Sequence, residues 1–380
     1  MLVRIYSSIT KVDKNEWEAV IGKNKLLSYD YLLHIERTMG REYPCRYICV
    51  YRKEEMVVVA PVFTIDIKLD TLMEEGWLRS ATRRLNAVFK RAGVITALVV
   101  GSPPSSGNFG IGIKGDTSRE KEIQVMVKAI KDVSRRGKTK LIIYKEVPSQ
   151  FKEDYGQILK EEGCSFGNDM PNNTLKIRWS DNEEFLASMR GKFRQAVKKS
   201  ERKLMVEGIQ VDMVKEISSA FGNREYDMYS EVLNKSSSVF EKLTPGYFRQ
   251  MDMVKSVAPR LLTIKKDKKI IGFFLICDSG EDEISAMFAG IDYRWNRDYD
   301  VYFNLFHQTI IHAIKQGKTM ISFGQNTYEV KGRIGCKVDR LYIGFCHRNR
   351  IVQALLKKFA DTLLPETPVK ERQVFKQEYI

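Results

Sequence analysis

Two fixed positive charges stand among glycines and small polar residues in the segment GQNTYEVKGRIGC, residues 324–336. The segment lies between two apolar runs, so Lys331 and Arg333 are carried to a place where buried strands nearly meet. A preorganised cation can stabilise the oxyanion that forms when an amine attacks an ester or thioester carbonyl. The alternative is a solvated lysine on a short surface helix. The segment is therefore the first candidate for a site.

Other groups near this segment could bind a substrate or move a proton. Tyr302 and Tyr328 could donate a proton to a leaving group, and aromatic packing is the alternative for both. The polar residues that could bind substrate or donor beside Lys331 are Gln325, Thr327 and Arg333. The acidic residues that could act as a base are Asp292, Asp300 and Glu329, and none is singled out by the sequence.

A strongly basic segment, EFLASMRGKFRQAVKKSERKL (residues 184–204), predicts one amphipathic helix. Its predicted core face consists of Leu186, Met189, Phe193 and Val197. The neighbouring face carries Arg190, Arg194 and Lys198, four residues apart. Like charges at this spacing repel one another, so a phosphate-bearing ligand is one explanation for them. An acidic neighbour within the fold is another, and solvated charges whose stems lie over apolar surface are a third.

The composition is that of a globular protein with a basic surface. The chain has 380 residues, enough for two domains, and a formal net charge of +15. Basic chains attract phosphates on nucleic acids, nucleotides or lipids, although a lysine-rich surface also serves solubility. No run is long enough to span a membrane and the first residues do not resemble a signal peptide, which predicts a cytoplasmic protein. The six cysteines and four histidines are scattered. We therefore expect buried reduced thiols and no metal site.

The chain contains an internal repeat. Residues 47–65 and residues 260–278 both read as two β-rich runs joined by a charged turn. Residues 128–147 predict a helix, a glycine stop and a buried strand, and residues 312–324 share their A-I-K and G-K-T. A short helix and the dipeptide Gly-Cys follow in each half. Three matched elements in one order indicate a tandem duplication.

The repeat predicts two α/β (α+β) domains, each with a mixed, partly antiparallel sheet flanked by helices. We expect an N-terminal domain over residues 1–179, ended by the strand NTLKIRW, and a C-terminal domain over residues 180–380. The latter carries the candidate site, a last strand near residues 339–348 and a C-terminal helix. Ser180 or Asp181 could cap the helix that opens it. The C-terminal helix has one apolar stripe, formed by Ile351, Leu355, Phe359 and Leu363, which indicates domain packing or dimerisation.

This order of elements resembles the GNAT acyltransferase fold, and two copies in one chain resemble the FemABX-like branch of that superfamily. Residues 185–211 are similar to the family's basic helix that ends in G-I-x-V. Residues 303–336 look like its signature, in which a strand ending in F-G precedes a lysine and a glycine. The resemblance implies that Lys331, before Gly335, lies at the reacting centre, and that a tyrosine such as Tyr302 or Tyr328 acts as proton donor.

The donor implied by the resemblance is an aminoacyl-tRNA or an acyl-CoA. GNAT enzymes hold the pyrophosphate of acyl-CoA with a glycine-rich turn, whereas the corresponding residues 292–304 contain no glycine. This departure favours aminoacyl-tRNA narrowly, with Arg190, Arg194 and Lys198 as donor-binding residues. A plain acyl-CoA-dependent N-acetyltransferase is the alternative.

The resemblance implies a primary amine as acceptor, on an amino acid, a peptide or a peptidoglycan precursor. The long helical arm of the cell-wall enzymes is missing, which leaves small-molecule amide formation open. The alternative from a different functional class is that the chain is a non-catalytic module that binds RNA or another anionic partner. The sequence does not decide the oligomeric state.

Overall fold

The computed structural model describes residues 1–68, 94–115, 118–205, 207–236 and 240–377. It divides into two compact units that are not continuous in sequence. The first unit contains Met1–Met170, Ser237–Leu243 and Arg340–Thr367. The second unit contains Pro171–Ser236, Thr244–Asp339 and Pro368–Ile380. Each unit is built on one mixed sheet, as the sequence predicted.

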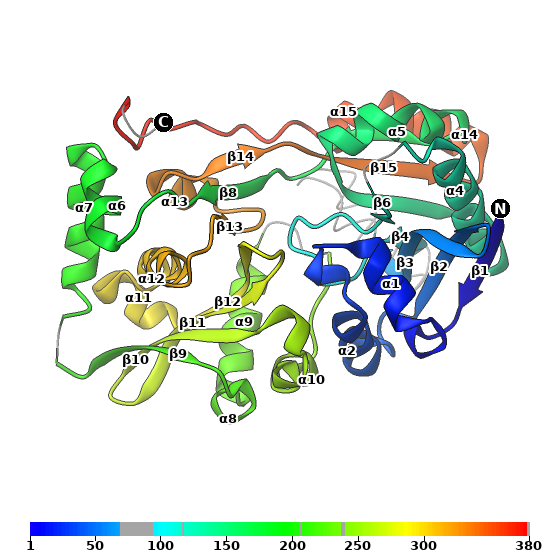
Figure 1. Ribbon diagram of the computed structural model, residues 1–380. Helices are drawn as coiled ribbons and strands as arrows, with labels where there is room; N and C mark the ends of the chain where they lie inside the picture. The colour runs from blue at the N-terminus through cyan, green and yellow to red at the C-terminus, as the bar shows by residue number, and fades with distance from the viewer. Residues whose placement is uncertain (69–93, 116–117, 206, 237–239, 378–380) are drawn as a thin grey trace, which may run out of the picture. The chain divides into compact units, whose positions relative to one another are not determined.

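The sheet of the first unit has the order β1-β2-β3-β4-β6-β15-β7, with β5 paired to β3 (Figure 1). Its strands are β1 (Leu2–Tyr6), β2 (Cys45–Arg52), β3 (Glu55–Lys68), β4 (Val94–Val100), β5 (Gly112–Ile113), β6 (Leu141–Pro148), β7 (Ser165–Asn168) and β15 (Leu341–His347). Its helices include α1 (Lys14–Ile21), α2 (Tyr29–Met39), α4 (Glu120–Arg136), α5 (Ser149–Glu161), α14 (Arg350–Lys358) and α15 (Ala360–Leu363). Among the described strands of this sheet, β4 and β6 pair in parallel and the other pairs are antiparallel.

The sheet of the second unit has the order β14-β8-β13-β12-β11-β10-β9. Its strands are β8 (Asn172–Lys176), β9 (Ile209–Val214), β10 (Arg260–Lys266), β11 (Lys269–Asp278), β12 (Glu283–Ile291), β13 (Met320–Ser322) and β14 (Lys337–Asp339). Its helices include α6 (Asn182–Ser188), α7 (Gly191–Arg202), α8 (Ile217–Ala220), α9 (Asn223–Lys235), α10 (Pro245–Arg249), α11 (Tyr293–Tyr299), α12 (Val301–Lys315) and α13 (Tyr328–Arg333). The apolar side of α12 packs on β10, β11 and β12 and forms much of the core.

Each unit takes one strand from the other half of the chain. Strand β15 lies between β6 and β7 in the first sheet, and β8 lies between β13 and β14 in the second (Figure 1). In both units the borrowed strand fills the gap between the strand before the short helix and the strand after it. The expected division at residue 179 follows chain order, whereas the compact units exchange these two strands. Residues 173–176 therefore belong to the sheet that carries the candidate site.

The basic segment forms two helices, and the prediction of one continuous helix is wrong. Helix α6 ends at Ser188 and α7 begins at Gly191, with Met189 and Arg190 extended between them. The break is stabilised because Met189 forms a β-bridge with Phe375 and Arg190 donates its backbone N–H to Val374. The predicted core face is confirmed: three of its residues are buried and Phe193 is partly buried. Asp181, one of the two expected caps, accepts a hydrogen bond from the backbone of Glu184.

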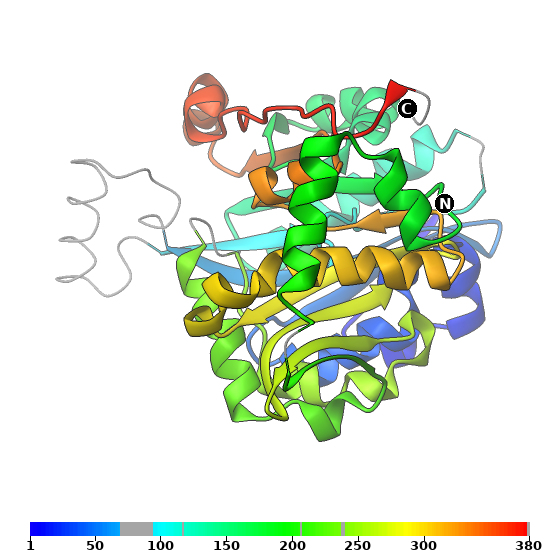
Figure 2. The ribbon, with the colours of Figure 1, turned by 90° about the vertical axis from the view of Figure 1, so that its left-hand side faces the viewer.

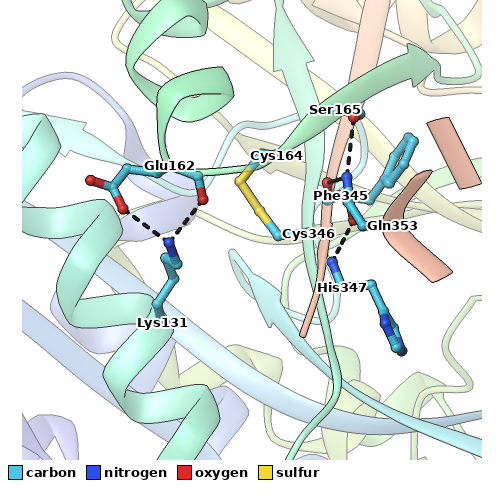
Figure 3. The surroundings of a disulfide bond; sticks show 8 residues. All are labelled: Lys131, Glu162, Cys164, Ser165, Phe345, Cys346, His347 and Gln353. Carbon is cyan, nitrogen blue, oxygen red and sulfur yellow. Dashed lines mark hydrogen bonds and ion pairs between the residues drawn. A yellow bond between two sulfur atoms is a disulfide. The ribbon is translucent and has the colours of Figure 1, made fainter. Parts of the chain in front are cut away.

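A disulfide joins Cys164, which precedes β7, to Cys346 on β15 (Figure 3). The expectation of reduced thiols is therefore wrong for this pair, because the borrowed strand brings together cysteines 182 residues apart. Gln353 of α14 fastens the same strand: its amide donates to Ser165 Oγ at 3.1 Å, and its oxygen accepts from the His347 backbone at 2.6 Å. The disulfide thus ties a strand from the end of the chain into the first sheet.

Replacing Cys164 with serine is expected to lower the free energy of unfolding by about 2–5 kcal/mol, because the crosslink closes a very long loop of the unfolded chain. Urea unfolding of oxidised protein, followed by circular dichroism, measures this change. Cys45→Ser is the matched control, because Cys45 is a free thiol of the same unit. Equal unfolding midpoints for wild type and Cys164→Ser would contradict the stabilising role of the bond.

The apolar stripe of the C-terminal helix is left exposed by the part of the chain that the structure describes. The four residues Ile351, Leu355, Phe359 and Leu363 are 72%, 51%, 46% and 44% exposed. Packing against the described residues therefore does not explain the stripe, and dimerisation stays a prediction. Within the described part of the chain, no helix has the length and apolar character needed to cross a membrane.

Candidate functional site

The candidate site lies where two parallel strands of the second sheet diverge. Strands β12 and β13 pair over three positions and separate after Ser285 and Ser322. Beyond this point the chain turns toward the borrowed strand, and the Phe323 N–H donates to the Asn173 carbonyl at 2.8 Å. Helix α13, which carries Lys331, follows five residues later. The short pairing of β12 with β13 thus opens the sheet next to the lysine.

Lys331 is buried, so the alternative of a solvated surface lysine is wrong. Lys331 is only 2% exposed. Its Nζ donates hydrogen bonds to the carbonyls of Gly324 at 2.9 Å and Gln325 at 2.7 Å. Burial lowers the pKa of Lys331 to about 7, because water no longer stabilises the charged form. An ammonium has three N–H groups, so the protonated lysine keeps one for a further acceptor.

Asn173 of the borrowed strand fixes the carbonyl that holds Lys331. Its backbone N–H and its side-chain amide both donate to the Gly324 carbonyl, at 3.1 Å and 2.8 Å. The preceding residue, Asn172, donates to Ser322 Oγ at 3.0 Å. Sequence reasoning missed this asparagine because it assigned the strand to the other domain. Two adjacent asparagines at the start of a buried strand were the only signal.

The backbone between β13 and α13 is strained. Gly324, Asn326 and Thr327 all have left-handed conformations, with φ values of 69°, 64° and 50°. Glycine and asparagine tolerate this region, whereas a β-branched threonine there is an outlier. Such strain persists only when the surroundings impose it, and it clusters at functional sites. The loop thus presents Gln325 and Thr327 in a conformation that the local sequence does not favour.

The hydroxyl of Tyr302 lies next to a proposed substrate-binding residue. Tyr302, on α12, lies 3.1 Å from Thr327 through their hydroxyl oxygens, and burial raises its pKa to about 12. Tyr328 donates its hydroxyl to the Pro171 carbonyl at 3.2 Å. Arg333 is exposed and places its guanidinium 5.2 Å from the ring centre of Phe303. Lys331, Gln325, Thr327 and Tyr302 therefore form one connected group.

The three acidic residues considered as bases all have cationic partners. Asp292 pairs with Arg294 at 2.7 Å and with Arg224 at 3.3 Å, and the hydrogen bond from Arg294 lowers the pKa of Asp292. Asp300 pairs with Lys203 at 3.0 Å, and Glu329 pairs with Arg372 at 3.4 Å. Each of them is therefore engaged in the fold, and none is a free base.

The glycine-free residues 292–304 form a helix and a sharp turn where a phosphate-binding loop would lie. Helix α11 runs directly into α12 through Asp300, which has a φ of 45°. At the start of α12, the Tyr302 N–H donates to Asn296 Oδ1 at 2.9 Å. A helix N-terminus binds phosphate through its free N–H groups. Here at least one of these groups is already occupied by a side chain.

Helix α7 of the basic segment packs against α12 (Figure 2). Asn304 of α12 donates a hydrogen bond to the Ser200 carbonyl at 3.0 Å. In the described part of the chain, Arg194 and Lys198 have no ion pair and no hydrogen bond to residues 324–336. Lys192, Lys199 and Arg202 of the same helix also form no ion pair with any residue that the structure describes. Arg190 lies at the helix start and donates to the Phe375 carbonyl at 3.2 Å.

Comparisons with known proteins agree with this fold. The model of the FemAB-like family, described as peptidoglycan biosynthesis/recognition, matches residues 8–333. The crystal structure of FemX is similar with a TM-score of 0.57 and 12% identity, covering 95% of this chain and 100% of that one. A tandem GNAT protein from the clavulanic acid biosynthesis pathway has a TM-score of 0.52 and 8% identity, covering 92% and 99%.

A conserved protein of unknown function from Bacteroides thetaiotaomicron has a TM-score of 0.56 and 10% identity, covering 91% of this chain and 100% of that one. No curated protein matches the sequence. At these low identities the structural matches establish the fold, and the family match covers most of the chain.

Proposed function

The chain belongs to the FemAB-like family and is an acyltransferase, and from that premise we propose that it forms an amide by transferring an aminoacyl group to a primary amine. Lys331 is the proposed catalytic residue. Its third N–H stabilises the oxyanion that develops on the donor carbonyl when the amine attacks. Tyr302, beside Thr327, donates the proton that the leaving oxygen needs. Gln325, Thr327 and Arg333 bind the substrates around this centre.

The observation that carries the proposal is the buried lysine held by two carbonyls at a break in the sheet. Burying an ammonium is costly unless the protein or a ligand compensates for the lost water. The left-handed backbone of Asn326 and Thr327 is a further energetic cost that packing alone does not require. Asn173 donates a hydrogen bond that gives the Gly324 carbonyl a second support. A preorganised charge near an opening in the sheet suits a reaction in which negative charge develops.

The donor that we propose is an aminoacyl-tRNA. The start of α12 lacks glycine and has an N–H occupied by Asn296, which argues against pyrophosphate binding there. The cations of α7, which have no ion-pair partner among the described residues, suit the phosphates of a large polyanion. Charged tRNA is a cytoplasmic donor, so this assignment places the reaction in the cytoplasm. For the acceptor we propose a peptidoglycan precursor, following the description of the family.

The test is a transfer assay with labelled donors. Purified protein is mixed with tRNA charged with labelled amino acids, or with labelled acetyl-CoA, together with a peptidoglycan precursor peptide that bears a free amine. Label moving from tRNA into an amide in an RNase-sensitive reaction is the expected result. Transfer from acetyl-CoA alone would replace the proposed donor. Tight tRNA binding without any product would instead indicate a binding module.

Removing two cations of α7 is expected to weaken donor binding. In the double variant Arg194→Ala, Lys198→Ala, the KM for charged tRNA should rise about tenfold, while kcat changes little, because these residues contact phosphates and not the reacting atoms. The slope of log KM against log salt should also become shallower, by about one to two.

The matched control removes two cations elsewhere in the second unit, Lys265 and Lys268, which lie at the β10–β11 hairpin. A double variant of α7 with unchanged KM and salt slope would exclude this face as the tRNA contact.

A further inference from the structure

The first unit has a second buried lysine at the corresponding break in its own sheet. Strands β4 and β6 pair in parallel up to Val100 and Tyr144 and then diverge. The next residue of β6, Lys145, is 7% exposed, and its Nζ donates to the Pro103 carbonyl at 2.8 Å. The same ammonium lies 5.7 Å and 5.5 Å from the ring centres of Phe63 and Phe240. Unlike Lys331, this lysine has several carboxylates for neighbours.

Three carboxylates lie near this lysine without pairing with it, and we call them the carboxylate cluster: Glu146, Asp169 and Glu241. Asp169 accepts backbone hydrogen bonds from Met170 at 2.8 Å and from Glu146 at 2.9 Å. Glu146 accepts one from the Gly107 N–H at 2.8 Å through Oε1. Glu241 is half-buried. Within the described residues, no ion pair joins any of the three to Lys145.

One oxygen of the carboxylate cluster is buried and has no partner. Glu146 is 5% exposed, and its Oε2 accepts no hydrogen bond in the described structure. Leaving an oxygen of a buried carboxylate without a hydrogen bond destabilises the fold more than leaving a buried neutral acceptor without one. Glu146 also has a φ of 57°, a left-handed conformation that is unusual for this residue type. The residue next to Lys145 is therefore held in a strained conformation and carries a buried carboxylate oxygen that is free to accept a hydrogen bond.

The carboxylates of the cluster outnumber the one lysine beside them. Burial and the nearby Glu146 carboxylate raise the pKa of Asp169 to about 6, and the pKa of Glu241 is raised to about 7 mainly by burial, with a contribution from Glu146. Above these values Asp169 and Glu241 both carry a negative charge. Carboxylates whose pKa is raised in this way are stabilised by any cation that comes close. A second cation would therefore complete the charge balance.

We propose that the carboxylate cluster of the first unit is a binding site for an organic ammonium, a primary amine in its protonated form. Glu146 Oε2 accepts one N–H of the ligand, and the half-buried Glu241 provides the second charged contact. Phe63 and Phe240 already lie beside one ammonium, and aromatic faces favour organic cations. Hard metal ions require several oxygen ligands, and no group of the described residues is arranged to hold one. The carboxylate cluster belongs to the first unit, whereas Lys331 belongs to the second.

Direct binding tests this proposal without any acyl donor. The probe is n-butylammonium, with 1-butanol as its uncharged counterpart, and binding to the full chain is measured by ligand-detected NMR at about pH 8, where the cluster is ionised. The expected result is saturable binding of the ammonium but not of the alcohol, weakened about tenfold or more at about pH 5. Tetramethylammonium, which has no N–H, should bind more weakly than n-butylammonium.

Glu146→Gln keeps an acceptor for the Gly107 N–H but removes the charge, and it should weaken binding about tenfold or more. Glu241→Gln, at a half-buried position, gives the same test with less risk to folding. The control is Glu162→Gln, which removes a carboxylate of the same unit that pairs with Lys131. Absence of binding by wild type would overturn the proposal. Affinities of Glu146→Gln and Glu241→Gln equal to that of wild type would also overturn it. Because no donor is present, either result leaves the transfer reaction to be judged separately.

Discussion

Lys331→Met is expected to lower kcat/KM for transfer by about 10²–10³-fold while leaving the protein folded. Loss of one preorganised oxyanion donor typically costs about 2.7–4 kcal/mol of transition-state stabilisation. Methionine fills a similar volume, so the space of the buried lysine side chain stays occupied. The measurement is the rate of amide formation from charged tRNA at donor concentrations well below KM.

The matched control for this variant is Lys337→Met. Lys337 lies on β14, six residues further along the chain, and is exposed. It carries the same charge without the burial or the two carbonyl contacts of Lys331, so its removal should change kcat/KM by less than about twofold. Equal activity of wild type and Lys331→Met, with product formed in both, would show that this lysine only supports the loop.

Elements with local hydrogen bonding could be predicted from the sequence. The hairpins β2–β3 and β10–β11 each consist of two β-rich, mostly apolar runs joined by a charged turn, and the paired strands are adjacent in the chain. Helices α4 and α12 each end at a glycine-containing turn before a buried strand. Such local patterns indicate which neighbouring segments pair, and they were sufficient to identify the repeat and the lysine segment.

Contacts between distant segments could not be predicted in the same way. Strand β8 pairs with β13, about 150 residues away, and β15 pairs with β6, about 200 residues away. The sequence of an apolar strand does not determine which sheet it joins, because both sheets have the same position open between matched elements. The role of Asn173 and the disulfide of Cys346 follow from this exchange, which is why both were missed. The break after Ser188 was missed because it depends on Phe375.

The free energy of unfolding is expected to rise with pH between about 7 and 9 in wild type relative to Lys331→Met. In the folded protein the pKa of Lys331 is about 7, whereas the ordinary value is 10.5. Between these values the unfolded chain binds a proton that the folded chain has released, so raising the pH favours the folded state. The difference amounts to about 2 kcal/mol between pH 7 and pH 9.

The comparison with Lys331→Met is needed because other buried groups titrate as well. The thiol of Cys336 has its pKa raised to about 12 by burial, so above about pH 9 it opposes the effect of the lysine. Cys45 and Cys49 act in the same direction, and all three are present in both proteins. Subtracting the two pH curves, each obtained by urea unfolding, therefore isolates the proton of Lys331.

The same proton should appear in the kinetics. If the ammonium is the oxyanion donor, kcat/KM calculated for the unprotonated form of the acceptor amine falls above about pH 7, with the midpoint found in the unfolding difference. Two midpoints that agree would assign one buried lysine to both stability and catalysis. Activity that instead rises through this midpoint would mean that neutral Lys331 accepts a proton from the amine. A flat difference curve would mean that water reaches Lys331 and that its charge is not buried at all.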